Sequence, residues 1–168
     1  MKCYCVYVRT ARCTAFADDA ARITGARVIY PQTVQHTWSH GKMTDIVHPL
    51  TPGYVFFYAE AAVDLMSVRR IEGYIRSLRG EDGEYELSGG DRDFAMVILA
   101  CGGMVGRTEV YREGDMIRLN EGLFAGVPAT ILRVNRRNSR MQLEIPFGPT
   151  TIRTWVEYEE IKRKGAEA

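Results

Sequence analysis

The sequence lacks the patterns of a membrane protein, a secreted protein or an extended rod. No apolar run approaches the ~20 residues that a membrane-spanning helix needs. The N-terminal residues 1–13 alternate apolar and polar side chains without the apolar stretch and cleavage site of a secretory signal, so we expect a cytoplasmic protein. Hydrophobic residues make up 46% of the 168 and charged residues 26%, which is typical of a globular protein with one domain or two small ones.

Cysteine is scarce, and its spacing does not indicate a metal site. The four cysteines contain no Cys-x-x-Cys pair, and in a chain without a secretory signal we expect them to be reduced thiols. Cys3 and Cys5 stand two positions apart in an extended segment and share one face of a strand. The simplest interpretation is that they are small buried hydrophobic side chains, with redox or metal chemistry as the alternative.

Net charge does not indicate a polyanion partner, but its distribution is uneven. The 22 basic and 21 acidic side chains give +1. Residues 1–102 hold 11 basic and 12 acidic side chains, and residues 103–168 hold 11 and 9. No acidic residue lies between Glu121 and Glu144, where four arginines fall. This local basic patch suits contact with a nucleic acid, and a solvated turn is the alternative.

The pattern of the N-terminal part predicts an α+β fold. Alternating or aromatic segments predict strands at 3–9, 26–38, 50–59 and 73–79. Helical spacing predicts helices at 13–24, at 60–70, and from an N-cap at Asp91 to a stop at Gly102. Residues 39–45 are expected to form a polar turn. This order predicts a four-stranded antiparallel sheet with helices packed on it.

After a glycine-rich stretch the pattern changes to short strands alone. Residues 103–113 are expected to be a linker between two small units. Beyond it, alternating segments at 115–120, 127–135, 139–145 and 151–158 predict a small β-barrel. Its core is expected to contain Leu119, Ile131, Leu143, Ile145 and Val156.

No constellation of catalytic residues is present, so we do not expect an enzyme, a metal or a cofactor. His36 and His40 have a spacing that could bind zinc on a helix, but this segment runs from a strand into a turn. Gly102 and Gly103 follow a helix rather than a strand, which does not fit a phosphate-binding loop. Recognition of a partner is the remaining class of function. The alternating aromatic strand 54–58 would form an apolar patch if one sheet face stays open, and a core strand is the alternative.

Four segments resemble, in order, the NusG family of transcription elongation factors. The segment 50–56, Leu-Thr-Pro-Gly-Tyr-Val-Phe, is similar to the family's Pro-Gly-Tyr strand, and 3–8 is similar to its first strand. Residues 68–73 are similar to a third family segment. Residues 114–135, from Gly-Asp through Gly-Leu-Phe-Ala-Gly to Arg-Val-Asn, are similar to the KOW motif. The resemblance covers nearly the whole chain.

The resemblance implies an NGN domain (1–102), a linker (103–113) and a KOW β-barrel (114–164). It also implies a monomer whose NGN domain binds the clamp helices of RNA polymerase, while the KOW domain contacts RNA, a ribosomal protein or a termination factor. The polymerase-facing candidates are Tyr4, Leu50, Thr51, Pro52, Gly53, Tyr54 and Phe56. Three positions depart from the family pattern, with Thr51 in place of a phenylalanine, Cys3 in place of a tryptophan and Ala129 in place of a glycine.

Within the family, the sequence is most similar to the specialised LoaP-type antiterminators. The basic segment around Arg136 and Arg137 is the physical reason to expect an RNA contact, because arginine suits phosphates and base edges. The expected ligand is the nascent transcript, through a structured leader. The nucleic-acid-binding candidates are Arg133, Asn135, Arg136, Arg137, Asn138 and Arg140. The alternatives are a general elongation factor and a ribosome-associated KOW protein.

Overall fold

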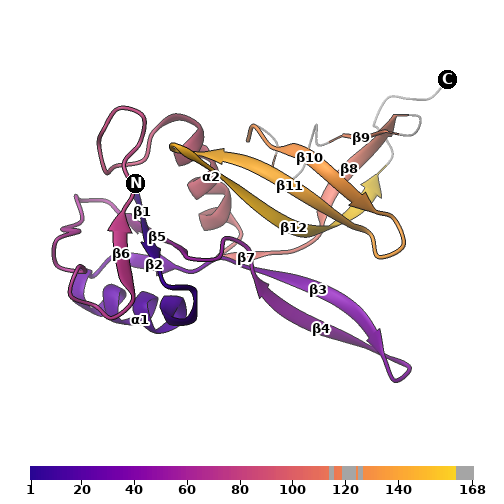
Figure 1. Ribbon diagram of the computed structural model, residues 1–168, viewed down its shortest axis with the longest axis horizontal. Helices are drawn as coiled ribbons and strands as arrows, with labels where there is room; N and C mark the ends of the chain where they lie inside the picture. Colours follow the sequence, from indigo (N-terminus) through magenta and orange to yellow (C-terminus); the bar gives the residue numbers. More distant parts are fainter. Residues whose placement is uncertain (114–115, 119–123, 125–126, 162–168) are drawn as a thin grey trace.

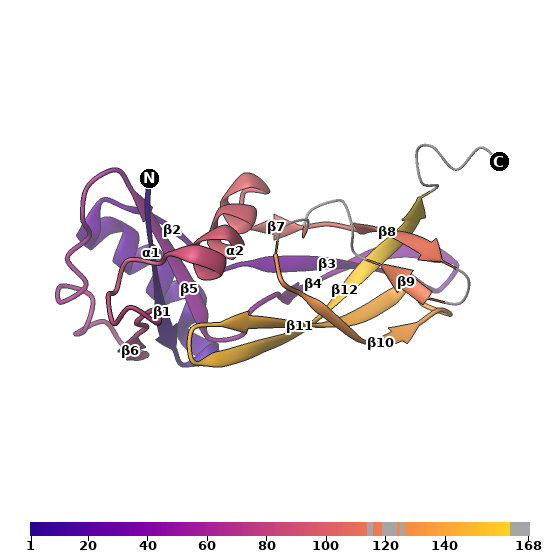
Figure 2. The ribbon, with the colours of Figure 1, turned by 90° about the horizontal axis from the view of Figure 1, so that it is seen from above.

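The computed structural model describes residues 1–113, 116–118, 124 and 127–161. Figure 1 shows a compact sheet with a helix at one end of the molecule and long strands that extend to the other end. Figure 2, turned by 90°, shows the same elongated arrangement. In the described part of the chain, no helix combines the length and apolar character needed to cross a membrane.

The predicted four-stranded antiparallel sheet is confirmed. Its order is β2 (Arg27–Ile29), β5 (Tyr54–Ala59), β1 (Lys2–Val8) and β6 (Tyr74–Ser77). Strand β1 pairs with β5 from Lys2↔Ala59 to Tyr7↔Tyr54, and all neighbours are antiparallel. Because side chains alternate along a strand, the register divides β5 into one face with Tyr54 and Phe56 and another with Phe57.

Helix α1 (Cys13–Thr24) covers the Phe57 face of this sheet, after a short 3-10 turn η1 (Thr10–Arg12). Its bounds match the predicted helix. The Phe16 ring packs edge-on against Phe57 at 6.4 Å between centroids. The helix ends at Gly25, whose left-handed φ of 70° is a conformation that glycine adopts without steric cost.

A long two-stranded ribbon leaves this sheet region. It consists of β3 (Gln32–Ser39) and β4 (Lys42–Pro49), joined by His40 and Gly41 with φ of 51° and 74°. Positive φ at both positions is typical of a two-residue type I′ hairpin turn. Strand β7 (Met104–Val105) pairs in parallel with the start of β3. The expected polar turn over 39–45 is therefore shorter than predicted, and β4 was not predicted.

The C-terminal strands form a second sheet in the order β10-β11-β12-β8-β9. Strands β10 (Thr130–Asn135), β11 (Arg140–Phe147) and β12 (Thr150–Ile161) are antiparallel neighbours. Strand β12 also pairs in parallel with β8 (Thr108–Glu113), which pairs with β9 (Met116–Arg118). In the described residues β9 and β10 do not pair with each other, so the predicted closed barrel is not seen there.

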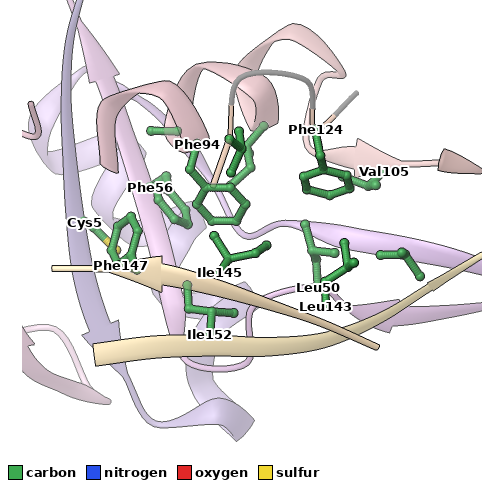
Figure 3. Close-up of a cluster of buried hydrophobic side chains, with 14 of the residues drawn as sticks. Cys5, Leu50, Phe56, Phe94, Val105, Phe124, Leu143, Ile145, Phe147 and Ile152 are labelled. Carbon is green, nitrogen blue, oxygen red and sulfur yellow. The ribbon is translucent and has the colours of Figure 1, made fainter. Parts of the chain in front are cut away.

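One hydrophobic core joins the two sheets. It contains Cys5 and Phe56 from the first sheet, Phe94 from helix α2 (Gly89–Ala100), and Leu143 and Phe147 from β11. Figure 3 shows these side chains converging between α2 and the strands. Leu143, Ile145 and Val156 are buried as predicted, Ile131 is half-buried, and Leu119 lies outside the described residues.

Two local predictions about helices are wrong. Residues 60–64 form bends and irregular backbone, and residues 65–70 form turns, instead of a helix. The Asp64 carboxylate accepts the Met66 N–H at 3.0 Å and the Ser67 hydroxyl donates to the Asp64 carbonyl, bonds that compete with a helix. Helix α2 is confirmed, but Ser88 rather than Asp91 stands at its N-cap position.

Candidate partner and nucleic-acid interfaces

Four aromatic side chains form a layer between the two sheets, which we call the aromatic layer: Tyr54, Phe56, Phe94 and Phe147. The Phe147 ring lies 5.7 Å from Phe56, 5.9 Å from Phe94 and 6.0 Å from Tyr54, in each case nearly perpendicular. Edge-to-face contacts of this kind add ~0.5–1.5 kcal/mol each beyond the burial of area. The layer is therefore the main apolar contact between β5, α2 and β11.

Two polar side chains at the edge of the aromatic layer also form hydrogen bonds across it. The Tyr58 hydroxyl donates to the Ala95 carbonyl at 2.6 Å, and burial raises the pKa of this phenol. The Asp91 carboxylate accepts the Gly148 N–H at 2.9 Å. Burial raises the pKa of Asp91 and outweighs the opposite effect of that hydrogen bond. These bonds hold α2 to β5 and to the turn between β11 and β12.

The Pro-Gly corner that precedes β5 is tightly packed. Thr51 is fully buried, and its hydroxyl donates to the Tyr54 carbonyl at 3.3 Å. Gly53 has a φ of 89°, and a Cβ there would lie 2.5 Å from the Tyr7 ring. Tyr7 in turn lies 5.0 Å from the Tyr54 ring. Thr51 thus stabilises the turn by a side-chain hydrogen bond.

The expected polymerase-facing residues do not form one exposed patch in this arrangement. Leu50 and Phe56 are fully buried beneath β11 and α2, and Gly53 is buried at the corner. Tyr4 is buried on the opposite face of the sheet, in the cluster that contains α1. Only Pro52 is exposed, and Tyr54 is half-buried. The sheet face that the sequence suggested could stay open is covered by the aromatic layer.

The basic segment forms a hairpin turn between β10 and β11, which we call the arginine hairpin (133–140). Arg133, Arg136 and Arg137 are exposed. The turn is held by the Asn135 side chain, which accepts the Asn138 N–H at 3.3 Å. Arg140 is half-buried, with its guanidinium 5.6 Å from the centre of the Trp155 ring. The hairpin therefore presents Arg136 and Arg137 at its tip and holds Arg140 against the sheet.

A buried glutamate connects the β3–β4 ribbon to the second sheet. Glu157 on β12 accepts the His36 backbone N–H at 2.5 Å and lies 2.6 Å from His36 Nδ1. Arg107 Nε donates to the same carboxylate at 3.4 Å. Burial by itself raises the pKa of Glu157, but the hydrogen bonds from His36 and Arg107 outweigh it and lower that pKa. Sequence patterns do not reveal this cluster, because its members are far apart in the chain.

Beside this cluster lies a groove of about 900 Å³, which we call the arginine groove. One wall is the ribbon, with Trp38 and Met43. The other is the tip of the arginine hairpin, with Arg136 and Arg137. The remaining lining residues come from the ribbon, the β7–β8 region, the hairpin and β12: Gln35, His36, Thr37, Arg107, Arg112, Asn138, Ser139, Glu157, Tyr158, Glu159 and Glu160.

The three histidines have separate surroundings. His36 contacts Glu157, and its Nε2 lies 3.5 Å from Asp45 Oδ1. His48 Nε2 lies 3.1 Å from the Gln35 side-chain oxygen, and His40 is in the ribbon turn. No group of three metal-binding side chains occurs in the described ranges. All four cysteines are free there, and Cys3, Cys5 and Cys13 are buried.

Comparisons with known proteins reveal a likeness in fold without a match in sequence. No family model matches the chain. No curated protein matches it. A solved structure described as "Domain interaction in Thermotoga maritima NusG" superposes with a TM-score of 0.51 over 93% of this chain and 93% of that chain, at 15% identity. The fold is therefore NusG-like over nearly the whole chain.

Proposed function

We propose that this protein is a bacterial transcription elongation regulator that binds RNA polymerase and promotes processive antitermination. The observation that carries the proposal is the NusG-like fold across 93% of both chains. The family motifs occur in the same order in the sequence, at positions 3–8, 50–56, 68–73 and 114–135. The proposed role is recognition rather than catalysis.

The proposed organisation is an NGN domain over 1–102, a linker over 103–113 and a KOW barrel over 114–164. The first unit is supported by the antiparallel sheet of β2, β5, β1 and β6. The proposed linker contains both β7 and β8. The second unit is supported by the strands from β9 to β12. Most of the glycine-rich part of the KOW motif, at 114–115, 122–123 and 125–126, lies outside the described residues.

The proposed polymerase contact uses the apolar residues around the Pro-Gly corner: Tyr4, Leu50, Thr51, Pro52, Gly53, Tyr54 and Phe56. Pro52 and Tyr54 are the accessible part of this set. A contact through Phe56 requires β11 and its Phe147 to move away from β5, because the two rings are in contact at 5.7 Å. Tyr54→Ala is therefore the better probe, since Phe56→Asp would place a charge in the core. Tyr85→Ala, at an exposed tyrosine elsewhere, is the matched control.

The proposed RNA contact uses the arginine hairpin: Arg133, Asn135, Arg136, Arg137, Asn138 and Arg140. The exposure of Arg136 and Arg137 at the tip of a defined turn supports it. Guanidinium groups pair with phosphates in a bidentate manner and stack on bases, which suits a structured leader in the nascent transcript. In this role the protein is of the LoaP type, acting on transcripts that carry the leader.

Transcription in vitro across an intrinsic terminator tests the proposal. The templates carry or lack the native operon leader, and the cognate polymerase is used with the wild-type protein, with Arg136→Ala/Arg137→Ala and with Tyr54→Ala. We expect leader-dependent readthrough that the arginine variant reduces and that Tyr54→Ala abolishes. No readthrough on either template, together with no binding to polymerase, would overturn the proposal.

A general NusG-type elongation factor is the second candidate, favoured by the fold likeness alone. Its KOW domain would bind a ribosomal protein or a termination factor instead of a specific RNA. It would accelerate elongation equally on templates with and without the leader. In that case the arginine variant would behave as wild type, and the arginine hairpin would be a solvated turn.

A further inference from the structure

The tip of the β3–β4 ribbon presents a largely exposed aromatic side chain. Trp38 is 73% exposed, and its cross-strand neighbour Met43 is 50% exposed. A tryptophan buries a large apolar area in most proteins, and exposed aromatic side chains are enriched at binding surfaces. In Figures 1 and 2 the ribbon and the turn between β10 and β11 extend toward the same end of the molecule. Trp38 lines the arginine groove together with Arg136 and Arg137 of the arginine hairpin.

The charged side chains that line the groove differ in whether they form ion pairs with one another. Arg112 donates to Glu160 through two nitrogens, at 3.0 and 2.6 Å, and Arg107 is bonded to Glu157. Arg137 makes no hydrogen bond or ion pair with the described part of the chain. The acidic side chains at the base are thus engaged by nearby arginines, except for the exposed Glu159. Positive charge is therefore left on Arg137, which lines the same groove as Trp38.

The two walls of the groove are held in place by the buried cluster around Glu157. His36 lies on the ribbon two residues before Trp38, so its side chain points to the same face of β3. Its bonds to Glu157, at 2.5 and 2.6 Å, join the ribbon to β12. Walls that are fixed before binding reduce the entropy that a ligand must lose on association.

We propose that the arginine groove binds a single-stranded segment of RNA, with one base stacked on Trp38 and the flanking phosphates on Arg136 and Arg137. This deepens the proposed RNA contact and rests on it. The combination of an exposed aromatic ring and a basic wall is typical of proteins that bind unpaired strands. The volume of about 900 Å³ lies near the upper end of the ~300–1,000 Å³ range of ligand pockets.

The stacking partner selects the kind of RNA. A base inside a duplex is already stacked between its neighbours and cannot reach an indole ring, whereas bases in loops and bulges can be turned outward. The occupant of the groove is therefore a loop or an unpaired stretch of the proposed leader. Arginine at the opposite wall adds contacts to phosphates, which make the affinity depend on salt.

Tryptophan fluorescence tests this directly, because the chain contains only Trp38 and Trp155. In a Trp155→Phe background, the full chain is titrated with a single-stranded RNA of about 12 nucleotides, within the ~4–16 that one small domain can cover. The same sequence as an RNA duplex and as a DNA strand provides the comparison. We expect quenching of Trp38 by the RNA strand, and weaker binding of the duplex and of the DNA.

Affinity measurements with variants separate this proposal from the broader one. Trp38→Ala should weaken binding of the RNA strand by roughly tenfold or more, and Trp38→Phe should retain most of it. Ile46→Ala is the matched control, since Ile46 is an exposed apolar residue on the ribbon outside the groove. All three variants should keep the wild-type melting temperature, because these side chains are exposed.

Different results would contradict different parts of the proposal. If Trp38→Ala binds as wild type while Arg136→Ala/Arg137→Ala is weakened, the groove proposal is wrong and the arginine hairpin contact stands. If neither variant is weakened, both fail. Equal binding of duplex and strand also overturns the stacking proposal. Loss of polymerase binding in Trp38→Ala without any effect on RNA would assign the indole to a protein partner.

Discussion

The C-terminal sheet contacts earlier parts of the chain in two places that differ in burial and polarity. At the aromatic layer it meets the four-stranded sheet and α2, and at the arginine groove it meets the β3–β4 ribbon. The three phenylalanines of the layer are buried, and the Phe147 ring contacts the three other rings. The groove is open, lined mainly by polar groups, and bridged at its base by one buried carboxylate. Apolar burial is not directional, whereas hydrogen bonds and charges select their partners. The aromatic layer therefore stabilises the packing of the two sheets, whereas the groove suits the proposed recognition of RNA.

Removing the central ring of the aromatic layer should have the largest effect. We expect Phe147→Ala to lower the free energy of unfolding by about 3–5 kcal/mol, because a buried phenylalanine leaves a cavity. Urea denaturation measures the difference. Leu132→Ala, at a 39% exposed position on β10, is the control and should cost little. A loss below about 1 kcal/mol in Phe147→Ala would contradict the role given to the layer.

The corner beside the layer should be the next most sensitive. Gly53→Ala combines a positive φ with a Cβ that would lie 2.5 Å from the Tyr7 ring, so we expect a loss of about 2–4 kcal/mol. Gly41→Ala at the ribbon turn has a similar φ of 74° but open space around it. It isolates the backbone strain, at about 1–2 kcal/mol. Equal losses in the two variants, measured by thermal unfolding, would show that the ring contact contributes nothing.

The carboxylate at the base of the groove should make stability depend on pH. The folded-state pKa of Glu157 is lowered from 4.5, so its contribution is fully present above that pH and is lost as the pH falls through the lower value. Glu157→Gln should cost about 2 kcal/mol at neutral pH, the usual worth of a charged hydrogen bond. Its stability should change less than that of the wild type as the pH falls below 4.5. If the free energies of unfolding of the wild type and of Glu157→Gln changed in parallel with pH, the hydrogen bonds between His36 and Glu157 would not contribute to stability as described.

The tip of the arginine hairpin should affect binding and leave stability almost unchanged. We expect Arg136→Ala/Arg137→Ala to unfold within ~0.5 kcal/mol of the wild type. Its RNA affinity should fall, and the slope of log affinity against log salt should flatten by up to ~2 phosphate contacts' worth. An unchanged slope would show that Arg136 and Arg137 do not contact RNA phosphates. It would also contradict the part that these two residues have in the groove proposal.

Local patterns predicted the elements that local forces determine. Helix α1, the four strands of the first sheet and the buried residues of β11 all follow from periodicity in the sequence. Strand β4 was missed because its residues 42–47 are all exposed and give no apolar alternation, and the signal present was the His40-Gly41 turn. The helix expected at 60–70 failed because side-chain bonds to Asp64 favour turns there.

The arrangement of the site required contacts that no local pattern contains. Alternation placed Tyr54 and Phe56 on one face, but it could not reveal that Phe147 covers them. The arginine hairpin was visible as a run of basic residues, whereas the opposite wall with Trp38 depends on the path of the ribbon. His36 was considered only as a metal ligand, and its partner Glu157 is far away in the chain.

The shared core has a consequence for the order in which the chain can fold during synthesis. Phe56 and Cys5 leave the ribosome long before β11, which supplies the side chains that cover them. The N-terminal half therefore emerges with an apolar sheet face that α2 covers only in part until the last strands are made. Contacts between such distant segments form slowly, and transiently exposed apolar faces attract one another. A chain truncated before β11 should consequently be prone to aggregate, even though every strand of its first sheet is present.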